Sequence, residues 1–326
     1  MGSHRAIAAV LLACALAAAG CGGDDPQDKA QPPPEARREQ FPSAKGNTLV
    51  ALRKELPRAG PVLAPSVTQF TPGDNRFGFG LFTASRAQIA DASVAVYVAP
   101  AGGGEARGPY VARYESLEVK PQFQSQSSAA DPDAAKSVYV ADIPFDKPGH
   151  YDVLGIARLD DRLVAATSAL PQLAVARDDP VPGPGDKAPV IDTPTEADAG
   201  GDIESIDTRV PPSTMHEENF ADVVGKKPVV LVFATPRLCQ SRVCGPVVDV
   251  AEQLKAKYGD QAEFIHMEIY RDNDVNKGFR PQVAAWRLPT EPWVFTIDKT
   301  AKVAARLEGA FSARELDAAI QAAVKG

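Results

Sequence analysis

Short runs in which apolar and polar residues alternate fill most of the first half of the chain. The runs are NRFGFGLFTA, SVAVYVAP, PYVARYES, KSVYVADIPF, HYDVLGIARL and RLVAATSAL, and Gly, Pro and Asp turns separate them. A period of two is typical of strands, and several short strands at this spacing predict an antiparallel β-sandwich. We expect this sandwich to occupy residues 44–177.

The last third of the chain changes to alternating strands and helices. Its apolar runs predict strands at 228–233, 263–270, 293–297 and 303–307, and helices at about 217–224, 247–258, 280–286 and 313–324. Helices between strands imply a sheet that is covered on both faces. We therefore expect residues 201–326 to form an α/β domain, in which parallel strands come first and an antiparallel hairpin comes last.

Two polar, proline-rich segments separate these regions from each other and from the N-terminus. Residues 21–43 have too little apolar surface to form a core, so we expect them to form a disordered tether. Residues 178–200 carry five prolines and read as a linker.

The first 20 residues have the pattern of an export signal. A basic start precedes the apolar run 6–19, which is shorter than the roughly 20 residues that a membrane-spanning helix needs. The run ends in Ala18, Ala19, Gly20 and Cys21, which resembles the lipobox of bacterial lipoproteins, although leucine is commoner than Ala18 at its position. The resemblance implies that Cys21 is lipidated and anchors the protein on the extracytoplasmic face of the cell membrane. The alternative is an ordinary signal peptide.

Charge and cysteine content narrow the possible functions. A net charge of −7 argues against nucleic acid as a partner, because phosphate binding needs a basic face. Of the four cysteines, Cys14 would leave with the signal and Cys21 would carry the lipid. Cys239 and Cys244 then remain in an oxidising compartment, where disulfides persist.

The segment YVADIPFDKPGHYDVLGIA resembles the hairpin between strands F and G of extracytoplasmic immunoglobulin-like modules. The resemblance implies that the sandwich at 44–177 is immunoglobulin-like.

The stretches KKPVVLVFATPRLC and VAARLEGAFSARELDAAI resemble two parts of the thioredoxin superfamily: the strand that leads to its first active cysteine, and its last strand and helix. The resemblance implies that Cys239 is the attacking thiolate and Cys244 the resolving thiol. The family also has a cis-proline beside the cysteines, for which we expect Pro292 rather than Pro289. The implied activity is thiol–disulfide exchange with exported proteins that carry thiols or disulfides.

The spacing CQSRVC departs from the CxxC of thioredoxins. In a continuous helix, residues five apart point about 140° away from each other, so the pair can meet only in a loop before the helix. Pro246 suits the first turn of the helix that follows. The helix N-terminus, together with Arg237 and Arg242, is expected to lower the pKa of Cys239.

Three alternatives remain open. The chain could be a non-enzymatic binding lipoprotein whose Cys239–Cys244 disulfide is structural. A copper-handling protein similar to the SCO family would need a histidine near the cis-proline, and His216 and His266 are expected elsewhere. A single-helix peroxiredoxin would need a threonine three residues before Cys239, whereas Thr235 stands four before it. No cofactor or metal is predicted.

Overall fold

The structure is a computed structural model that describes residues 35–57, 59–170 and 172–326. The predicted signal at 1–20, Cys21 and the tether up to residue 34 lie outside the described residues. Among the residues that are described, no helix is long and apolar enough to cross a membrane.

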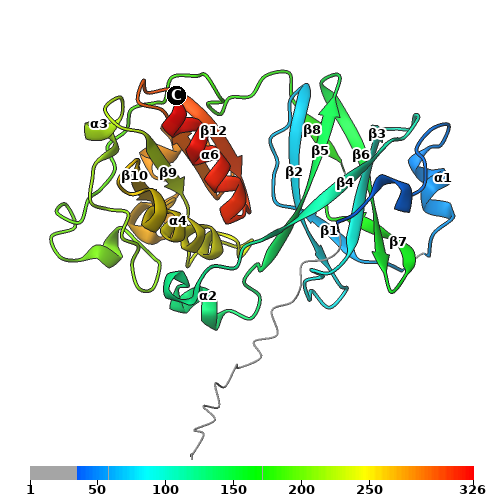
Figure 1. The fold of residues 1–326 in the computed structure, drawn as a ribbon, viewed down its shortest axis with the longest axis horizontal. Helices are drawn as coiled ribbons and strands as arrows, with labels where there is room; N and C mark the ends of the chain where they lie inside the picture. The colour runs from blue at the N-terminus through cyan, green and yellow to red at the C-terminus, as the bar shows by residue number, and fades with distance from the viewer. Residues whose placement is uncertain (1–34, 58, 171) are drawn as a thin grey trace, which may run out of the picture. The chain divides into compact units, whose positions relative to one another are not determined.

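The predicted strands of the first half form, and they pair edge to edge (Figure 1). They are β1 (Val62–Pro65), β2 (Gly73–Phe82), β3 (Ser93–Pro100), β4 (Arg107–Ser116), β5 (Ser137–Phe145), β6 (Gly149–Leu159), β7 (Arg162–Ser168) and β8 (Leu173–Val175). The order is β3-β4-β5-β2-β1-β7-β6-β8, and a further pairing of β3 with β6 closes a seven-stranded barrel.

The predicted two-sheet sandwich is therefore wrong in one respect, because the sheet is closed. Strand β4 pairs with β3 up to Ala112 and with β5 from Arg113 onward, so one strand joins both sides. Strands β1 and β7 pair in parallel and close the opposite side. The predicted hairpin of immunoglobulin-like type is also wrong: β5 pairs with β2 and β4, whereas β6 pairs with β3, β7 and β8.

Residues 35–43 do not behave as the predicted tether. They include a 3-10 helix (Arg38–Gln40) and precede the helix α1 (Leu49–Lys54). The side chain of Phe41 is 7% exposed and packs with Ala44 and with Leu52 of α1 against the outside of the barrel. Hydrogen bonds add to this packing: the Tyr97 hydroxyl donates to the Pro42 carbonyl at 2.7 Å and the Arg158 guanidinium to the Gln40 carbonyl at 3.0 Å. Composition alone did not reveal these contacts.

The second sheet contains β9 (Val229–Phe233), β10 (Glu263–Met267), β11 (Trp293–Ile297) and β12 (Val303–Glu308). Its order is β10-β9-β11-β12, in which β10 and β9 are parallel and β11 and β12 form an antiparallel hairpin. The helices are α3 (Phe220–Val223), α4 (Cys244–Tyr258), α5 (Pro281–Ala285) and α6 (Ala313–Lys325).

Two apolar clusters cover the two faces of this sheet. Residues of α4 and α6 pack on one face, and Phe220, Val283 and Trp286 pack on the other. Both tryptophans, Trp286 and Trp293, belong to the second cluster. The strand order and the helices on both faces are those of the thioredoxin fold, as the sequence predicted.

The predicted linker at 178–200 is packed rather than free. Val181 and Ala188 are buried in the same cluster as Trp286. The backbone also pairs with β12: Gly185 N–H donates to the Val303 carbonyl at 2.8 Å, and Val303 N–H donates to Asp186 at 2.9 Å. The prolines prevent regular structure, but they do not prevent these contacts.

Both sheets belong to one compact unit, Pro32–Gly326. The guanidinium of Arg76 on β2 donates to both carboxylate oxygens of Glu315 on α6, each at 2.8 Å. Ser312, the N-cap of α6, donates to Glu115 on β4 at 2.7 Å. The remaining short elements are η2 (Pro121–Phe123), α2 (Gln126–Ala130), η3 (Ile203–Ser205), η4 (Arg271–Asn273) and η5 (Val275–Lys277).

Candidate active site

Two consecutive turns bring the cysteines together despite their unusual spacing. The N–H of Cys239 donates to the carbonyl of Thr235 at 3.1 Å, and the N–H of Arg242 donates to the carbonyl of Cys239 at 3.4 Å. Arg242 adopts a left-handed φ of 59°, which redirects the chain into α4 at Cys244. The two sulfur atoms, both free thiols, lie within 4.8 Å of each other. The predicted loop therefore forms, although Cys244 is already the first residue of the helix.

The surroundings of Cys239 stabilise a thiolate. The thiol of Cys244 donates a hydrogen bond to the sulfur of Cys239. This bond is the largest of the effects that lower the pKa of Cys239 to about 6, and burial opposes them. The Ser241 hydroxyl, 3.2 Å away, and the N–H groups of Cys244 and Val243 act in the same direction as the Cys244 thiol. Such donors at a helix N-terminus favour negative charge.

Cys244 has the opposite environment. It is fully buried, and burial raises the pKa of its thiol, as does its hydrogen bond to Cys239. The two thiols therefore differ in protonation at neutral pH: Cys239 is ionised, whereas Cys244 stays protonated and donates the hydrogen bond between them.

The arginines are not the main cause of the lowered pKa of Cys239, contrary to the prediction from sequence. The guanidinium of Arg242 forms an ion pair with Asp131 at 2.6 Å, and its side chain is half exposed. Arg237 is exposed, and its backbone N–H donates to the Thr208 hydroxyl at 3.1 Å. Hydrogen bonds from the turn and from the start of α4 replace the two predicted charges.

Alkylation of the reduced protein with iodoacetamide checks this assignment. Because only the thiolate reacts, the rate at Cys239 should rise with pH through a midpoint near pH 6 and level off above it. Ser241→Ala, which removes one donor, should move the midpoint upward. A midpoint near pH 8.5, as an ordinary thiol would show, contradicts the assignment.

The peptide bond between Glu291 and Pro292 is cis, which is the isomer that the sequence predicted at this proline. No role for Glu291 was predicted, yet its carboxylate lies within 4.8 Å of both sulfurs. Burial raises the pKa of Glu291 to about 7, and the charge of the Cys239 thiolate acts in the same direction. The Tyr270 hydroxyl donates to this carboxylate at 3.4 Å and opposes the rise. An acid of this strength beside two thiols can exchange protons with them.

A cavity of about 540 Å³ lies beside Cys239. Arg237, Cys239 and Gln240 line one side of it, and Ser127 and Asp131, which lie in and just after α2, line another. The N-terminal half of the chain thus contributes to the surroundings of the thiol.

The donor set at the cysteines suits copper poorly. Cys239, Cys244 and Glu291 could together hold a metal ion, but the third donor is a carboxylate. Cu(I) prefers thiolate, thioether and imidazole ligands, and carboxylates suit harder ions. This geometry favours proton transfer between the three groups over copper handling.

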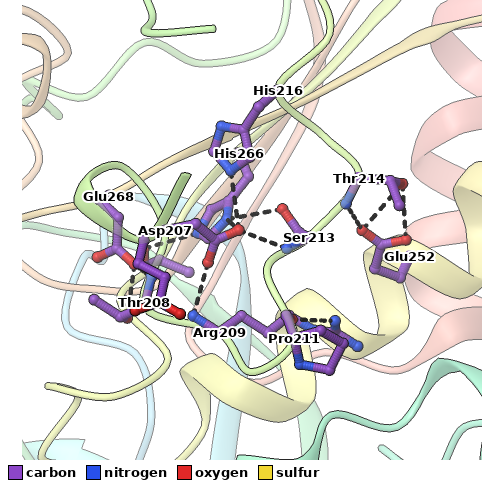
Figure 2. Close-up of polar contacts among 12 residues, drawn as sticks. Asp207, Thr208, Arg209, Pro211, Ser213, Thr214, His216, Glu252, His266 and Glu268 are labelled. Carbon is purple, nitrogen blue, oxygen red and sulfur yellow. Dashed lines mark hydrogen bonds and ion pairs between the residues drawn. The ribbon is translucent and has the colours of Figure 1, made fainter. Parts of the chain in front are cut away.

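A second cluster of buried polar side chains lies between the segment 207–216 and β10. Figure 2 shows the Asp207 carboxylate in its centre, and Ser213, His216 and His266 surround it. His216 lies in the loop before α3. The one available signal was the buried run FIHMEIY, in which His266 and Glu268 are two polar residues on the same face of a strand.

Comparison with known proteins gives the following matches. No protein-family model and no curated protein matches the chain. A solved structure from Chlorobium tepidum, assigned as a thiol:disulfide interchange protein DsbE, is 20% identical with a TM-score of 0.32, and the match covers 44% of this chain and 99% of that one. A thiol:disulfide interchange protein of the thioredoxin family from Chlorobium tepidum TLS is 15% identical with a TM-score of 0.30, over 46% and 99%. The fold assignment rests on the strand order and helix placement described above.

Proposed function

We propose that the protein is a thiol–disulfide oxidoreductase that acts through Cys239 and Cys244. The observation that carries the proposal is the contrast between two adjacent thiols, one hydrogen-bonded and acidic, the other buried and protonated. A structural pair would need proximity but not this difference. The experiment that tests the proposal is the reduction potential of the pair in glutathione buffers.

The exchange reaction follows from the positions of the two sulfurs. The Cys239 thiolate attacks one sulfur of a partner disulfide, forms a mixed disulfide, and releases the other partner sulfur as a thiolate. Cys244 then loses its proton, and its sulfur attacks the sulfur of Cys239. The Cys239–Cys244 disulfide forms, and the second partner thiolate leaves. Two electrons pass from this protein to the partner, and the reverse sequence oxidises a partner dithiol.

Glu291 is the proposed proton acceptor for Cys244 in the second step. Cys244 cannot ionise unaided because burial raises its pKa. Once Cys239 is in the mixed disulfide, it no longer carries the negative charge that raises the pKa of Glu291. The carboxyl then ionises more readily and becomes a base at the moment when the Cys244 proton must leave.

We further infer, from the sequence alone, that lipid on Cys21 holds the protein at the extracytoplasmic face of the cell membrane, where its partners would be exported proteins with thiols or disulfides. Cell fractionation tests this inference. Cys21→Ser should move the chain from the membrane fraction to the soluble fraction, whereas Cys239→Ser should leave it in the membrane fraction. If both variants distribute as the unaltered chain does, the lipid anchor is contradicted.

A further inference from the structure

The Asp207 cluster has the dimensions of a metal site. The Asp207 Oδ2 atom lies 3.0 Å from His216 Nε2 and 3.3 Å from His266 Nδ1 (Figure 2). In a tetrahedral zinc site with bonds of about 2.0 Å, neighbouring ligand atoms lie about 3.3 Å apart. The Ser213 hydroxyl lies 3.2 Å from His266 Nδ1, on the same side of the ring.

Three carboxylates are buried in this region. The carboxylates of Asp207, Asp249 and Glu268 are each 1% exposed. The guanidinium of Arg209 donates to Asp249 at 2.9 Å and otherwise to the carbonyls of Pro211 and Phe123, and the charge of Arg280 acts on Glu268. Arg209 donates to the Asp207 carboxylate through its backbone N–H and not through its guanidinium. Buried carboxylates need a compensating charge, and a divalent ion between Asp207 and the histidines would supply it.

The hydrogen bond that His266 makes through Nε2 is of the kind that a metal-bound histidine makes. His266 Nε2 lies 3.1 Å from the carbonyl of Ala234, so this nitrogen carries the proton. In the neutral ring, Nδ1 then presents a lone pair toward Asp207. Zinc-bound histidines commonly donate their second N–H to a carbonyl or carboxylate in this way, which fixes the tautomer.

We propose that Asp207, His216 and His266 bind one Zn²⁺ ion in a closed structural site, and that the Ser213 hydroxyl is the nearest candidate for the fourth ligand. Zinc fits because imidazole and carboxylate are among its usual ligands. The three side chains are 1%, 3% and 0% exposed, which leaves no open position for substrate and assigns the site to structure rather than catalysis.

The site would support the loop that carries the attacking cysteine. Thr208, next to Asp207, donates to the Glu268 carboxylate through its N–H at 2.8 Å and its hydroxyl at 2.7 Å. The same hydroxyl accepts the N–H of Arg237, two residues before Cys239. A metal that fixes Asp207 against β10 therefore also fixes the start of the cysteine turn.

Metal analysis of the full chain tests the proposal. Cys239 and Cys244 could themselves bind zinc, so the measurement uses the double variant that carries both Cys239→Ser and Cys244→Ser. This chain is unfolded in a denaturant that contains a chelator and is then refolded with ZnCl₂. After dialysis this chain should retain about one zinc per molecule. His216→Gln in the same background should retain none, and the matched control His150→Gln, at an exposed histidine of β6, should retain it.

A refolded chain with native circular dichroism and no retained zinc overturns the proposal, and so does equal retention by the His216→Gln and His150→Gln chains. If His216→Gln fails to fold, Co²⁺ in the double serine chain decides. Four-coordinate Co²⁺ bound through nitrogen and oxygen gives an intense visible band, and a weak six-coordinate spectrum contradicts the closed site.

Discussion

Cys244→Ser should trap the protein on its partners as mixed disulfides. The Cys239 thiolate remains in this variant and can still attack, but no second thiol is present to release the partner. The serine hydroxyl can still donate a hydrogen bond to the Cys239 sulfur, as the Ser241 hydroxyl does, so the Cys239 thiolate should persist in this variant. In cells whose thiols are blocked with an alkylating agent, we expect new high-mass bands that disappear on reduction.

Cys239→Ser is the matched control for this experiment. It keeps the buried thiol, which burial holds protonated, and lacks the nucleophile. Exchange should fall by at least about 10³-fold, because removal of the attacking group removes the covalent route. If neither variant accumulates a mixed disulfide with any cell-envelope protein, the exchange function is contradicted. If both accumulate equally, the assignment of the attacking thiol is wrong.

Glu291→Gln should separate the two steps of the exchange. With an aromatic disulfide that releases a coloured thiolate, the first release reports attack by Cys239 and the second reports attack by Cys244. Loss of the carboxylate should slow the second release by about 10²-fold, which is typical of a missing general base. The first release should not slow, because the variant removes a like charge from the neighbourhood of Cys239.

Glu218→Gln, at an exposed glutamate before α3, is the control for a change of charge alone and should leave both releases unchanged. The second release of the unaltered protein should also accelerate with pH, with a midpoint below about 7, because the Glu291 carboxyl that acts as the base ionises more readily once Cys239 is in the mixed disulfide. A second release that is as fast in Glu291→Gln as in the unaltered chain would assign the proton transfer to another group.

The C-terminal elements could be predicted because their determinants are local. The buried strand Val229–Phe233 and the hairpin strands Trp293–Ile297 and Val303–Glu308 each lie within a residue of their predicted bounds. Each has an apolar pattern that burial on a sheet dictates, bounded by turn residues. The order of helices and strands then leaves few ways to connect them.

The closure of the barrel could not be predicted in the same way. Alternation predicted strands at β2 to β7, but the same alternation suits a two-sheet sandwich and a closed sheet. The difference lies in long-range pairing, such as the switch of β4 from β3 to β5 at Ala112 and Arg113. The short strands β1 and β8 have too few residues to show a period, so they were missed.

The residues of the candidate site divide in the same way: those in local motifs could be predicted, and those that depend on long-range contacts could not. Cys239, Cys244 and Pro292 were predicted from local motifs and a family resemblance, and the structure brings the two cysteines together in a turn. Asp207 comes from a loop whose partners are distant in sequence, and nothing in its neighbours indicates those contacts. Glu291 adjoins Pro292, which was predicted beside the cysteines, but the sequence does not show the direction of its side chain. The positions of Arg237 and Arg242 were misleading for a related reason: proximity in sequence does not give side-chain direction, and Arg242 pairs with Asp131, 111 residues away.

The reduction potential of the Cys239–Cys244 pair tests the central claim most directly. The protein is equilibrated with glutathione buffers of graded ratio, quenched by alkylation, and the oxidised fraction is measured by mass. A redox-active pair should exchange reversibly, with a potential less negative than about −300 mV, as labile disulfides have. A potential below about −300 mV, with no exchange with glutathione, would make the pair a structural disulfide and contradict the oxidoreductase assignment.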